Sequence, residues 1–258
     1  MTGFSADWLA QRGLADARTR DQRLAARLTA HVAGKAALRV LDLGAGTGAN
    51  MCATAPLLPV LQHWLLADND AALLARAEAP EGVAIERRVA DLAADLAGLF
   101  DPALGLVTAS AFLDLCGAAF LDRLADAVVA AGAALYAVLS YDGGETWTPP
   151  HPLDAQALAA FHADQRRDKG LGPALGPEAQ AHLAARLQHH GYRVHEAPSD
   201  WRLRQPRDAE LIAALAEGSA AAIAPALGAG QAAEWRRART AAGRVVIGHR
   251  DLLALPPG

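Results

Sequence analysis

Leu38-Arg-Val-Leu-Asp-Leu-Gly-Ala-Gly-Thr-Gly-Ala-Asn50 is the stretch of sequence that decides the fold. The apolar run Val40–Leu43 predicts a buried strand, which ends at the glycines of Gly44–Gly48. Glycine lets the backbone turn sharply and approach a ligand closely, because no Cβ stands in the way. The residues that follow predict a helix, whose N-terminus offers unpaired N–H groups and a positive dipole end. The stretch therefore predicts a nucleotide-type pocket between a strand and a helix.

The glycine spacing alone fits two classes of nucleotide site. Gly44, Gly46 and Ala49 satisfy the dinucleotide fingerprint. Asp42, two residues before the first glycine, and a third glycine at Gly48 fit another pattern. With these residues the stretch resembles motif I of the class I S-adenosylmethionine (SAM)-dependent methyltransferases. An acid beside the loop suits SAM, whose ammonium and sulfonium are cationic, better than it suits a pyrophosphate.

Two further acids follow predicted strands in the order that this resemblance implies. Asp68 ends the strand Trp64–Asp68, where an acid takes the ribose hydroxyls of either adenosine cofactor. Asp91 follows the strand Val83–Val89, where the resemblance implies contact with the adenine amino group, although an aspartate there is also a common turn residue. Asp70 is a candidate helix cap. The cofactor-binding residues expected from the resemblance are Asp42, Gly44, Ala45, Gly46, Asn50, Asp68, Asn69, Asp91, Leu92 and Ser110.

Strands and helices alternate over residues 38–140, which predicts an α/β fold with a doubly wound, mostly parallel sheet. Two late strands resemble the family's ending: one from Tyr192 to Ala197, with a continuation to Leu203 as the alternative, and one at 244–255. The resemblance implies seven strands in all, with the C-terminal strand antiparallel beside the fifth.

The remaining segments predict additions to this sheet. A single amphipathic helix is expected over 5–33, so residues 1–36 would form an N-terminal helical cap. The SAM-binding domain would then span 37–258. Substrate insertions are expected at about 141–177, beginning with a loop, and at 204–242, which is helical.

Methyl transfer needs few catalytic side chains, because SAM carries its own electrophile and alignment supplies much of the rate. Asp114 follows the fourth predicted strand and must face the pocket, unless it only caps the next helix. The candidates for a general base are, in order, Asp114, His162 and Tyr141. The candidates for substrate binding are Trp8, Arg12 and Arg20 on one helix face, and Lys169 on the face of His162 and Gln165, with solvated, ion-paired faces as the alternative.

Composition limits the partners. The chain has 258 residues, a formal net charge of −4, two lysines and no basic run, which disfavours a nucleic-acid partner. Two unpaired cysteines, Cys52 and Cys116, and the lack of a signal peptide predict a reduced cytoplasmic protein. The apolar run Ala127–Ser140 is too short to cross a bilayer, which needs about 20 residues, so no membrane partner is expected. No cluster has metal-site spacing.

These patterns favour a SAM-dependent methyltransferase that acts on a small molecule. The sequence lacks the Asn/Asp-Pro-Pro-Tyr/Phe motif of nucleobase and glutamine methylation. An NAD(P)-dependent oxidoreductase is one alternative, but Tyr141 is followed four residues later by Glu145 rather than by a catalytic lysine. A non-catalytic SAM-binding module is another alternative.

Overall fold

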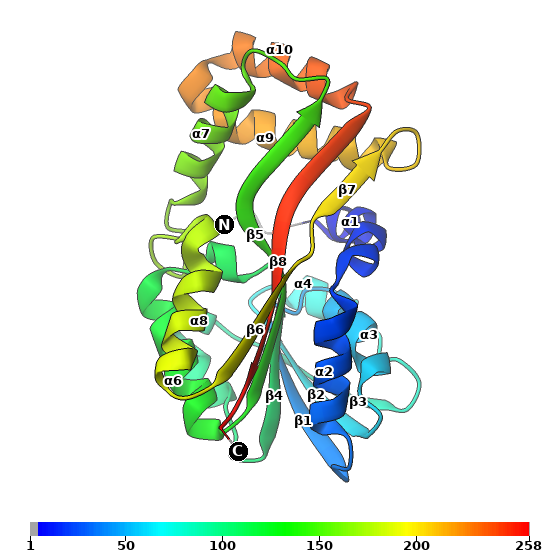
Figure 1. Cartoon of the computed structure of the whole chain (residues 1–258), viewed down its shortest axis with the longest axis vertical. Helices are drawn as coiled ribbons and strands as arrows, with labels where there is room; N and C mark the ends of the chain where they lie inside the picture. Colours follow the sequence, from blue (N-terminus) through cyan, green and yellow to red (C-terminus); the bar gives the residue numbers. More distant parts are fainter. Residues whose placement is uncertain (1–4, 258) are drawn as a thin grey trace.

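The computed structural model describes residues 5–257, which form an eight-stranded mixed sheet with helices on both faces (Figure 1). The strand order is β3-β2-β1-β4-β5-β8-β6, with β7 also paired to β8. β1 to β5 pair in parallel, and β8 runs antiparallel to β5, β6 and β7. The strands are β1 (Ala37–Leu43), β2 (Leu61–Asp68), β3 (Val83–Val89), β4 (Leu104–Ser110), β5 (Ala134–Thr148), β6 (Arg193–Pro198), β7 (Trp201–Arg204) and β8 (Arg244–Leu255).

Alternate residues of the central strands enter two separate cores. Leu41 and Val107 pack against α6 and α8 on one face, while Val40 and Leu106 pack with α2 and α3 on the other. This is the pattern of a parallel sheet buried on both sides. The helices are α1 (Ala6–Thr19), α2 (Gln22–Val32), α3 (Ala49–Thr54), α4 (Ala71–Leu74), α5 (Leu92–Asp95), α6 (Ala118–Ala131), α7 (Asp154–Gln165), α8 (Ala179–His189), α9 (Ala209–Leu227) and α10 (Ala229–Thr240).

The predicted doubly wound sheet with an antiparallel C-terminal strand is confirmed, and it carries one more strand than expected. The extra strand arises because the chain after β6 bends at Ser199 and Asp200 and then pairs again with β8. β6 pairs with the C-terminal part of β8, from Arg250 to Leu255, and β7 pairs with its N-terminal part, from Arg244 to Ile247.

The segment Asp142–Pro152 is predicted as a loop, but its residues up to Thr148 form, with Tyr141, the outer half of β5. They pair with the start of β8, about a hundred residues later in the chain. Tyr141 faces His249 and Glu145 faces Ile247, so a bulge absorbs Asp142-Gly-Gly144. The glycines that indicated a loop therefore mark an irregularity in a strand, because glycine accommodates bulges.

The outer halves of β5 and β8 continue beyond the parallel sheet and support a second lobe (Figure 1). We call this part the helical lobe; it consists of 141–148, β7, 244–249 and the helices α7, α9 and α10. The rest of the sheet and its helices form the sheet lobe. The helical lobe has its own core, which includes Trp147, Trp201 and Trp235. The insertions expected at 141–177 and 204–242 thus pack together.

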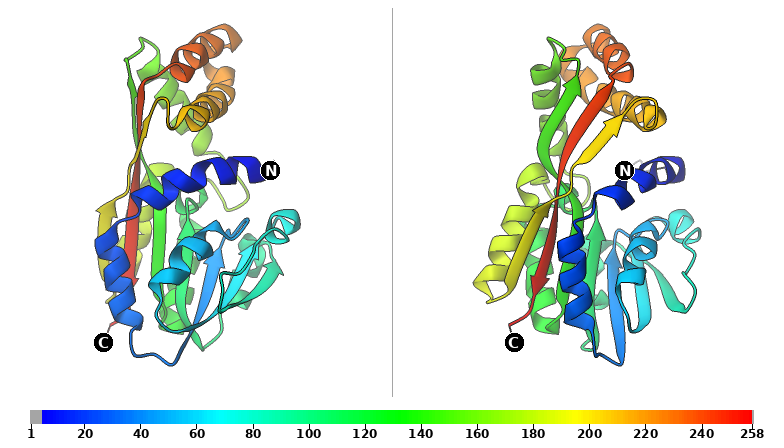
Figure 2. Two further views of the ribbon diagram at one scale, coloured as in Figure 1. Left: turned by 90° about the vertical axis from the view of Figure 1, so that its right-hand side faces the viewer. Right: turned by 45° about the vertical axis from the view of Figure 1, so that its right-hand side comes forward.

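The N-terminal segment is two helices rather than the single helix expected over 5–33. Ser5 caps α1, accepting a hydrogen bond from the Trp8 backbone N–H. The chain turns at Arg20 because Asp21 caps α2 and its own N–H donates to Asp251 Oδ2 at 2.8 Å. In both views of Figure 2, α1 lies between the sheet lobe and the helical lobe. Residues 1–4 of the expected cap lie outside the described residues.

α9 is unusually apolar. Among residues 5–257 it alone is long and apolar enough to meet the criteria for a membrane span. Leu211, Ile212 and Ile223 of α9 are buried in the core of the helical lobe, and Leu215 and Leu227 pack against it partly buried.

Candidate active site

The glycine turn after β1 has the backbone that only glycine adopts easily. Gly44, Gly46 and Gly48 have φ of 63°, 52° and 80°, all in the left-handed region. A Cβ added at Gly44 would lie 2.8 Å from Phe112 Cδ2, and one at Gly46 would lie 3.2 Å from Leu9 Cδ1 of α1. The turn is therefore covered closely by β4's following loop and by α1.

Asp42 lies directly beneath this turn and is fully buried. Its Oδ1 accepts hydrogen bonds from Asn50 Nδ2 at 2.6 Å and from Thr108 Oγ1 at 2.8 Å. Its Oδ2 is buried and has no hydrogen-bond partner among the described residues. Burial raises the pKa of Asp42 to about 6, against the lowering effect of these two hydrogen bonds. One buried carboxylate oxygen is thus free at the glycine turn.

The other two acids of the predicted cofactor site stand at the ends of the neighbouring strands. Asp68 accepts from the Gly46 N–H through Oδ2 at 2.8 Å and from the Asp70 N–H through Oδ1 at 2.9 Å. Asp70 caps α4 as expected. Asp91 accepts from the Ala93 N–H and so caps α5, which gives it a structural role. Since β1, β2 and β3 are adjacent, the three acids line one edge of the sheet.

Four other predicted cofactor residues differ in how deeply they are buried. Ala45 is buried in the turn, and its N–H donates to the Ala67 carbonyl at 3.1 Å. Asn69 is exposed just after β2, whereas Leu92 is buried in a core. Ser110 is the last residue of β4 and is half-buried.

The end of β4 and the middle of β5, where the pairing of β5 with β8 shifts register, have irregular backbone. Ala111 and Leu139 have positive φ, 49° and 57°, although neither is glycine. The Ala111 N–H donates to the Val138 carbonyl, and the Leu139 N–H donates to Asp251 Oδ1 at 2.8 Å. Such conformations are unfavourable and persist only where the surroundings fix them. Asp251, which also holds the turn before α2, is the group that fixes Leu139.

Asp114, the first candidate for a general base, is buried in a short turn after β4. Its Oδ2 accepts from Gln165 Nε2 of α7 at 3.0 Å. Burial raises the pKa of Asp114, while the charges of Arg12 and Lys169 lower it. The alternative that Asp114 caps α6 is wrong, because α6 begins at Gly117 with no side-chain cap.

The other two candidates, Tyr141 and His162, are in direct contact. The Tyr141 hydroxyl lies 3.0 Å from His162 Nε2 and donates to Glu145 Oε1 at 3.2 Å. Burial lowers the pKa of His162 and raises that of Tyr141. Since Gln165 is on the same helix as His162, α7 brings all three candidates to one region. Glu145 completes this chain of polar groups.

The residues predicted to bind substrate separate into two places. Arg12 is paired with Asp16 at 2.9 Å and lies over the Trp201 ring at 5.0 Å, close enough to Asp114 to affect its pKa. Trp8 packs against the core of the helical lobe. Arg20 instead lies on the other side of the glycine turn, donating to Asn50 Oδ1 at 2.9 Å and to Thr54 Oγ1 at 3.1 Å. The expected ion-paired face is present for Arg12 and Asp16.

Lys169 does not share a helix face with His162, because α7 ends at Gln165. It lies in the segment after the helix, half-buried, where its charge still acts on Asp114.

Comparison with solved structures places this architecture in a known class of fold. The chain superimposes on the cyclopropane synthase MmaA2 from Mycobacterium tuberculosis with a TM-score of 0.54 and 12% identity, covering 97% of this chain and 94% of that one. A candidate methyltransferase from Bacillus halodurans C-125 gives 0.52 and 14% identity, covering 91% and 99%. The fold is that of the class I SAM-dependent methyltransferases.

A third structure with the methyltransferase fold contains a ligand. The mycolic acid cyclopropane synthase CmaA1, solved with S-adenosylhomocysteine (SAH) and CTAB, matches with a TM-score of 0.51 and 11% identity, covering 89% of this chain and 82% of that one. No protein-family model matches the sequence, and no curated protein sequence does either.

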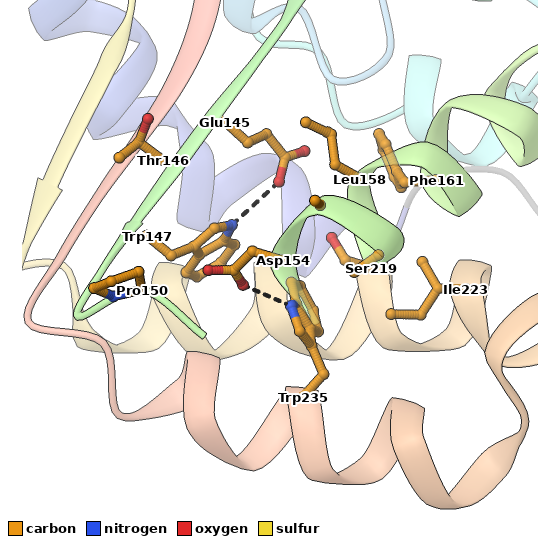
Figure 3. A pocket seen from close by; sticks show the side chains of 12 residues that line it. Glu145, Thr146, Trp147, Pro150, Asp154, Leu158, Phe161, Ser219, Ile223 and Trp235 are labelled. Carbon is orange, nitrogen blue, oxygen red and sulfur yellow. Dashed lines mark hydrogen bonds between the residues drawn. The ribbon is translucent and has the colours of Figure 1, made fainter. Parts of the chain in front are cut away.

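The helical lobe that is added to the methyltransferase fold contains a partly open cavity of about 210 Å³ (Figure 3). It lies between the outer half of β5 and the helices α7, α9 and α10, next to the contact between Tyr141 and Glu145. None of the residues that line this cavity is predicted from the sequence to be functional. Its lining residues are Glu145, Thr146, Trp147, Pro150, Asp154, Ala155, Ala157, Leu158, Phe161, Ser219, Ile223 and Trp235.

Proposed function

We propose that this chain is a SAM-dependent methyltransferase that acts on a small-molecule acceptor. The observation that carries the proposal is the free, buried Oδ2 of Asp42 at the glycine turn of a class I methyltransferase fold. A buried carboxylate oxygen without a partner favours a cationic ligand, because an unpaired buried charge is costly. SAM is such a ligand, whereas a pyrophosphate would be repelled.

The residues at the sheet edge fit the rest of this cofactor. Asp68 stands at the end of β2 and has lone pairs left for ribose hydroxyls, since each of its oxygens accepts one backbone hydrogen bond. Asp91, at the end of the next strand, is proposed to meet the adenine amino group. CmaA1, with the same fold, binds the product form SAH, which supports this choice of cofactor.

SAM supplies an electrophilic methyl group, so the protein must mainly align the acceptor. Asp114 is our first candidate for a base, because burial raises its pKa and so makes its carboxylate a better proton acceptor. His162 is a second candidate, because its lowered pKa keeps the ring neutral at pH 7 and able to accept a proton. Tyr141 would position the acceptor through its hydroxyl.

The acceptor is proposed to be small because the candidate catalytic groups Tyr141 and His162 lie beside a cavity of about 210 Å³, which Glu145 connects to them through its contact with Tyr141. The net charge of −4 and the scarcity of lysine support an acceptor that is not a nucleic acid. A cytoplasmic location is proposed from the cysteine usage alone.

Calorimetric titration with SAH tests the proposal. We expect saturable binding to the unmodified protein and at least tenfold weaker binding to Asp68→Ala. The control Asp101→Ala removes an exposed aspartate that pairs with Arg39 and should bind SAH normally. Unchanged affinity of Asp68→Ala would reject the ribose assignment. A melting temperature raised by NADH and not by SAH would favour the oxidoreductase. Binding of SAM without conversion to SAH across a panel of acceptors would favour the non-catalytic module.

A further inference from the structure

The cavity of the helical lobe has walls of aromatic rings. Trp147 from β5 and Trp235 from α10 meet edge to face, with ring centroids 5.6 Å apart and planes at 75°. Phe161 and Leu158 of α7 and Ile223 of α9 close the other sides (Figure 3). Indole faces carry negative electrostatic potential, so such walls favour a cation as well as an apolar group.

Glu145 brings to this cavity a carboxylate that forms no ion pair with another residue of the described range 5–257. Its Oε1 accepts from the Tyr141 hydroxyl and its Oε2 from Trp147 Nε1 at 3.2 Å, and both of these donors are uncharged. Burial raises the pKa of Glu145, which reflects the cost of a desolvated charge.

Asp154, the second carboxylate of the cavity, differs from Glu145 because it is paired with a cation. Its Oδ1 accepts from Trp235 Nε1 at 2.9 Å, and its Oδ2 accepts from the His151 N–H at 2.8 Å. The buried Arg239 guanidinium lies 3.5 Å from Asp154 Oδ2 and supplies the counter-charge. Of the two acids that line the cavity, only Asp154 therefore has a cationic partner within residues 5–257.

We propose that this cavity binds an organic ammonium group, with Glu145 as its counter-ion and the rings of Trp147 and Trp235 as its walls. The arrangement combines a desolvated carboxylate with aromatic faces, which is how proteins hold alkylammonium ligands. Arg239 already lies over the Trp147 ring, 5.9 Å from its centroid, so one face of this indole interacts with a cation in the protein itself. The size of the cavity limits the ligand to a small amine.

The position of Glu145 connects this site to methyl transfer. Tyr141 and Glu145 are four residues apart in the chain. Because of the bulge in β5, however, they pair with His249 and Ile247, which are only two residues apart on β8. The Glu145 carboxylate thus contacts the Tyr141 hydroxyl, which contacts His162. The ammonium group would therefore belong to the methyl acceptor. This part of the inference rests on the proposed function, whereas the binding of the cation does not.

The test is calorimetric titration of the full-length protein with 2-phenylethylammonium chloride and, as a neutral probe of the same shape, 2-phenylethanol. We expect the ammonium to bind at least tenfold more tightly than the alcohol. Glu145→Gln removes the charge but keeps one acceptor oxygen, which can still accept from Trp147 Nε1, while its NH2 group can donate to the Tyr141 hydroxyl oxygen. It should weaken ammonium binding at least tenfold and leave alcohol binding unchanged. The control Glu217→Gln removes an exposed glutamate of α9 that pairs with Arg236 and should bind both probes normally.

Equal affinities for the two probes, no binding of the ammonium, or full affinity in Glu145→Gln would each overturn the inference. Thermal unfolding of each variant confirms that it is folded, and Trp147→Phe, which keeps an aromatic wall, gives a second variant with an expected severalfold loss. Titration with SAH separates the two proposals. SAH binding without ammonium binding rejects the cation site alone, and ammonium binding without SAH binding rejects only the methyltransferase function.

Discussion

The two lobes share the strands β5 and β8 but differ in how they are assembled. In the sheet lobe, β1 to β5 are parallel and each is followed by a connecting segment, and every consecutive pair of these strands is adjacent in the sheet except β3 and β4, where the chain crosses back to the other side of β1. In the helical lobe, Tyr141–Thr148 pairs with Arg244–His249, and α7 packs on α9 across some 50 residues of sequence. The sheet lobe thus follows from local pattern, whereas the helical lobe depends on distant partners. The candidate acceptor site lies where the two meet.

The most damaging change that we expect is at the joint between the lobes. Asp251 accepts from the backbone N–H of Asp21 and of Leu139, and it is fully buried. Asp251→Ala leaves both donors unsatisfied, at about 1–3 kcal/mol each, so the free energy of unfolding should fall by about 2–6 kcal/mol. Chemical denaturation measures this loss.

Asp251→Asn supplies the comparison, since it retains one acceptor oxygen and should lose about half as much. If both variants were as stable as the unmodified protein, the two N–H groups would not depend on Asp251, and the joint would have to be held elsewhere.

Gly44→Ala is expected to have the next largest effect, in the sheet lobe. The added methyl group would clash with Phe112 and would also take a left-handed backbone, at a combined cost of about 2–4 kcal/mol. SAH binding should be lost with it, because the turn must shift.

Gly82→Ala is a matched control for this substitution. Gly82 has φ of 77°, yet nothing lies within 4 Å of an added Cβ, so only the backbone cost of about 1–2 kcal/mol remains. Equal destabilisation of the two variants would show that the contact with Phe112 does not matter.

Much of the sheet lobe could be predicted because its signals are local. The strands Val83–Val89, Leu104–Ser110 and Arg244–Leu255 begin and end where their apolar patterns do. Asp42 and Asp68 come near the ends of successive predicted strands, and for this reason their position beside the glycine turn could also be predicted.

The helical lobe could not be predicted in the same way. Tyr141–Thr148 has turn-forming residues, and only its pairing with β8 makes it a strand. Glu145 carried no signal of function, because its burial depends on Trp147 beside it and on Trp235, which comes 90 residues later and closes the cavity. The break between α1 and α2 likewise depends on Asp251, at the far end of the chain.

The affinity for SAM should depend on pH through Asp42, which lies in the sheet lobe. Asp42 has a pKa of about 6 in the folded protein, above its unfolded value of about 3.9. The folded state therefore binds this proton more tightly, and the stability contributed by Asp42 is present below about pH 4 and is lost as the pH rises through about 6. Cationic SAM should favour ionised Asp42, so its affinity should rise about tenfold between pH 5 and pH 7.

Calorimetric titration with SAM at several pH values measures this rise, and Asp42→Asn should bind weakly at every pH. Glu145→Gln, whose altered carboxyl lies in the other lobe, should keep the full pH dependence. A SAM affinity that did not change with pH in the unmodified protein would contradict the assignment of Asp42 to the cofactor.

The smallest effect that we expect is in the helical lobe. Trp235→Phe keeps the aromatic wall but removes the indole N–H that donates to Asp154 Oδ1. Asp154 retains the His151 N–H and Arg239, so the free energy of unfolding should fall by only about 1 kcal/mol. SAH affinity should not change, because Trp235 lies in the core of the helical lobe and contributes nothing to the glycine turn. A parallel loss of SAH binding would mean that the two lobes respond as one unit, and the separation between a locally encoded cofactor half and a distantly assembled acceptor half would then be wrong.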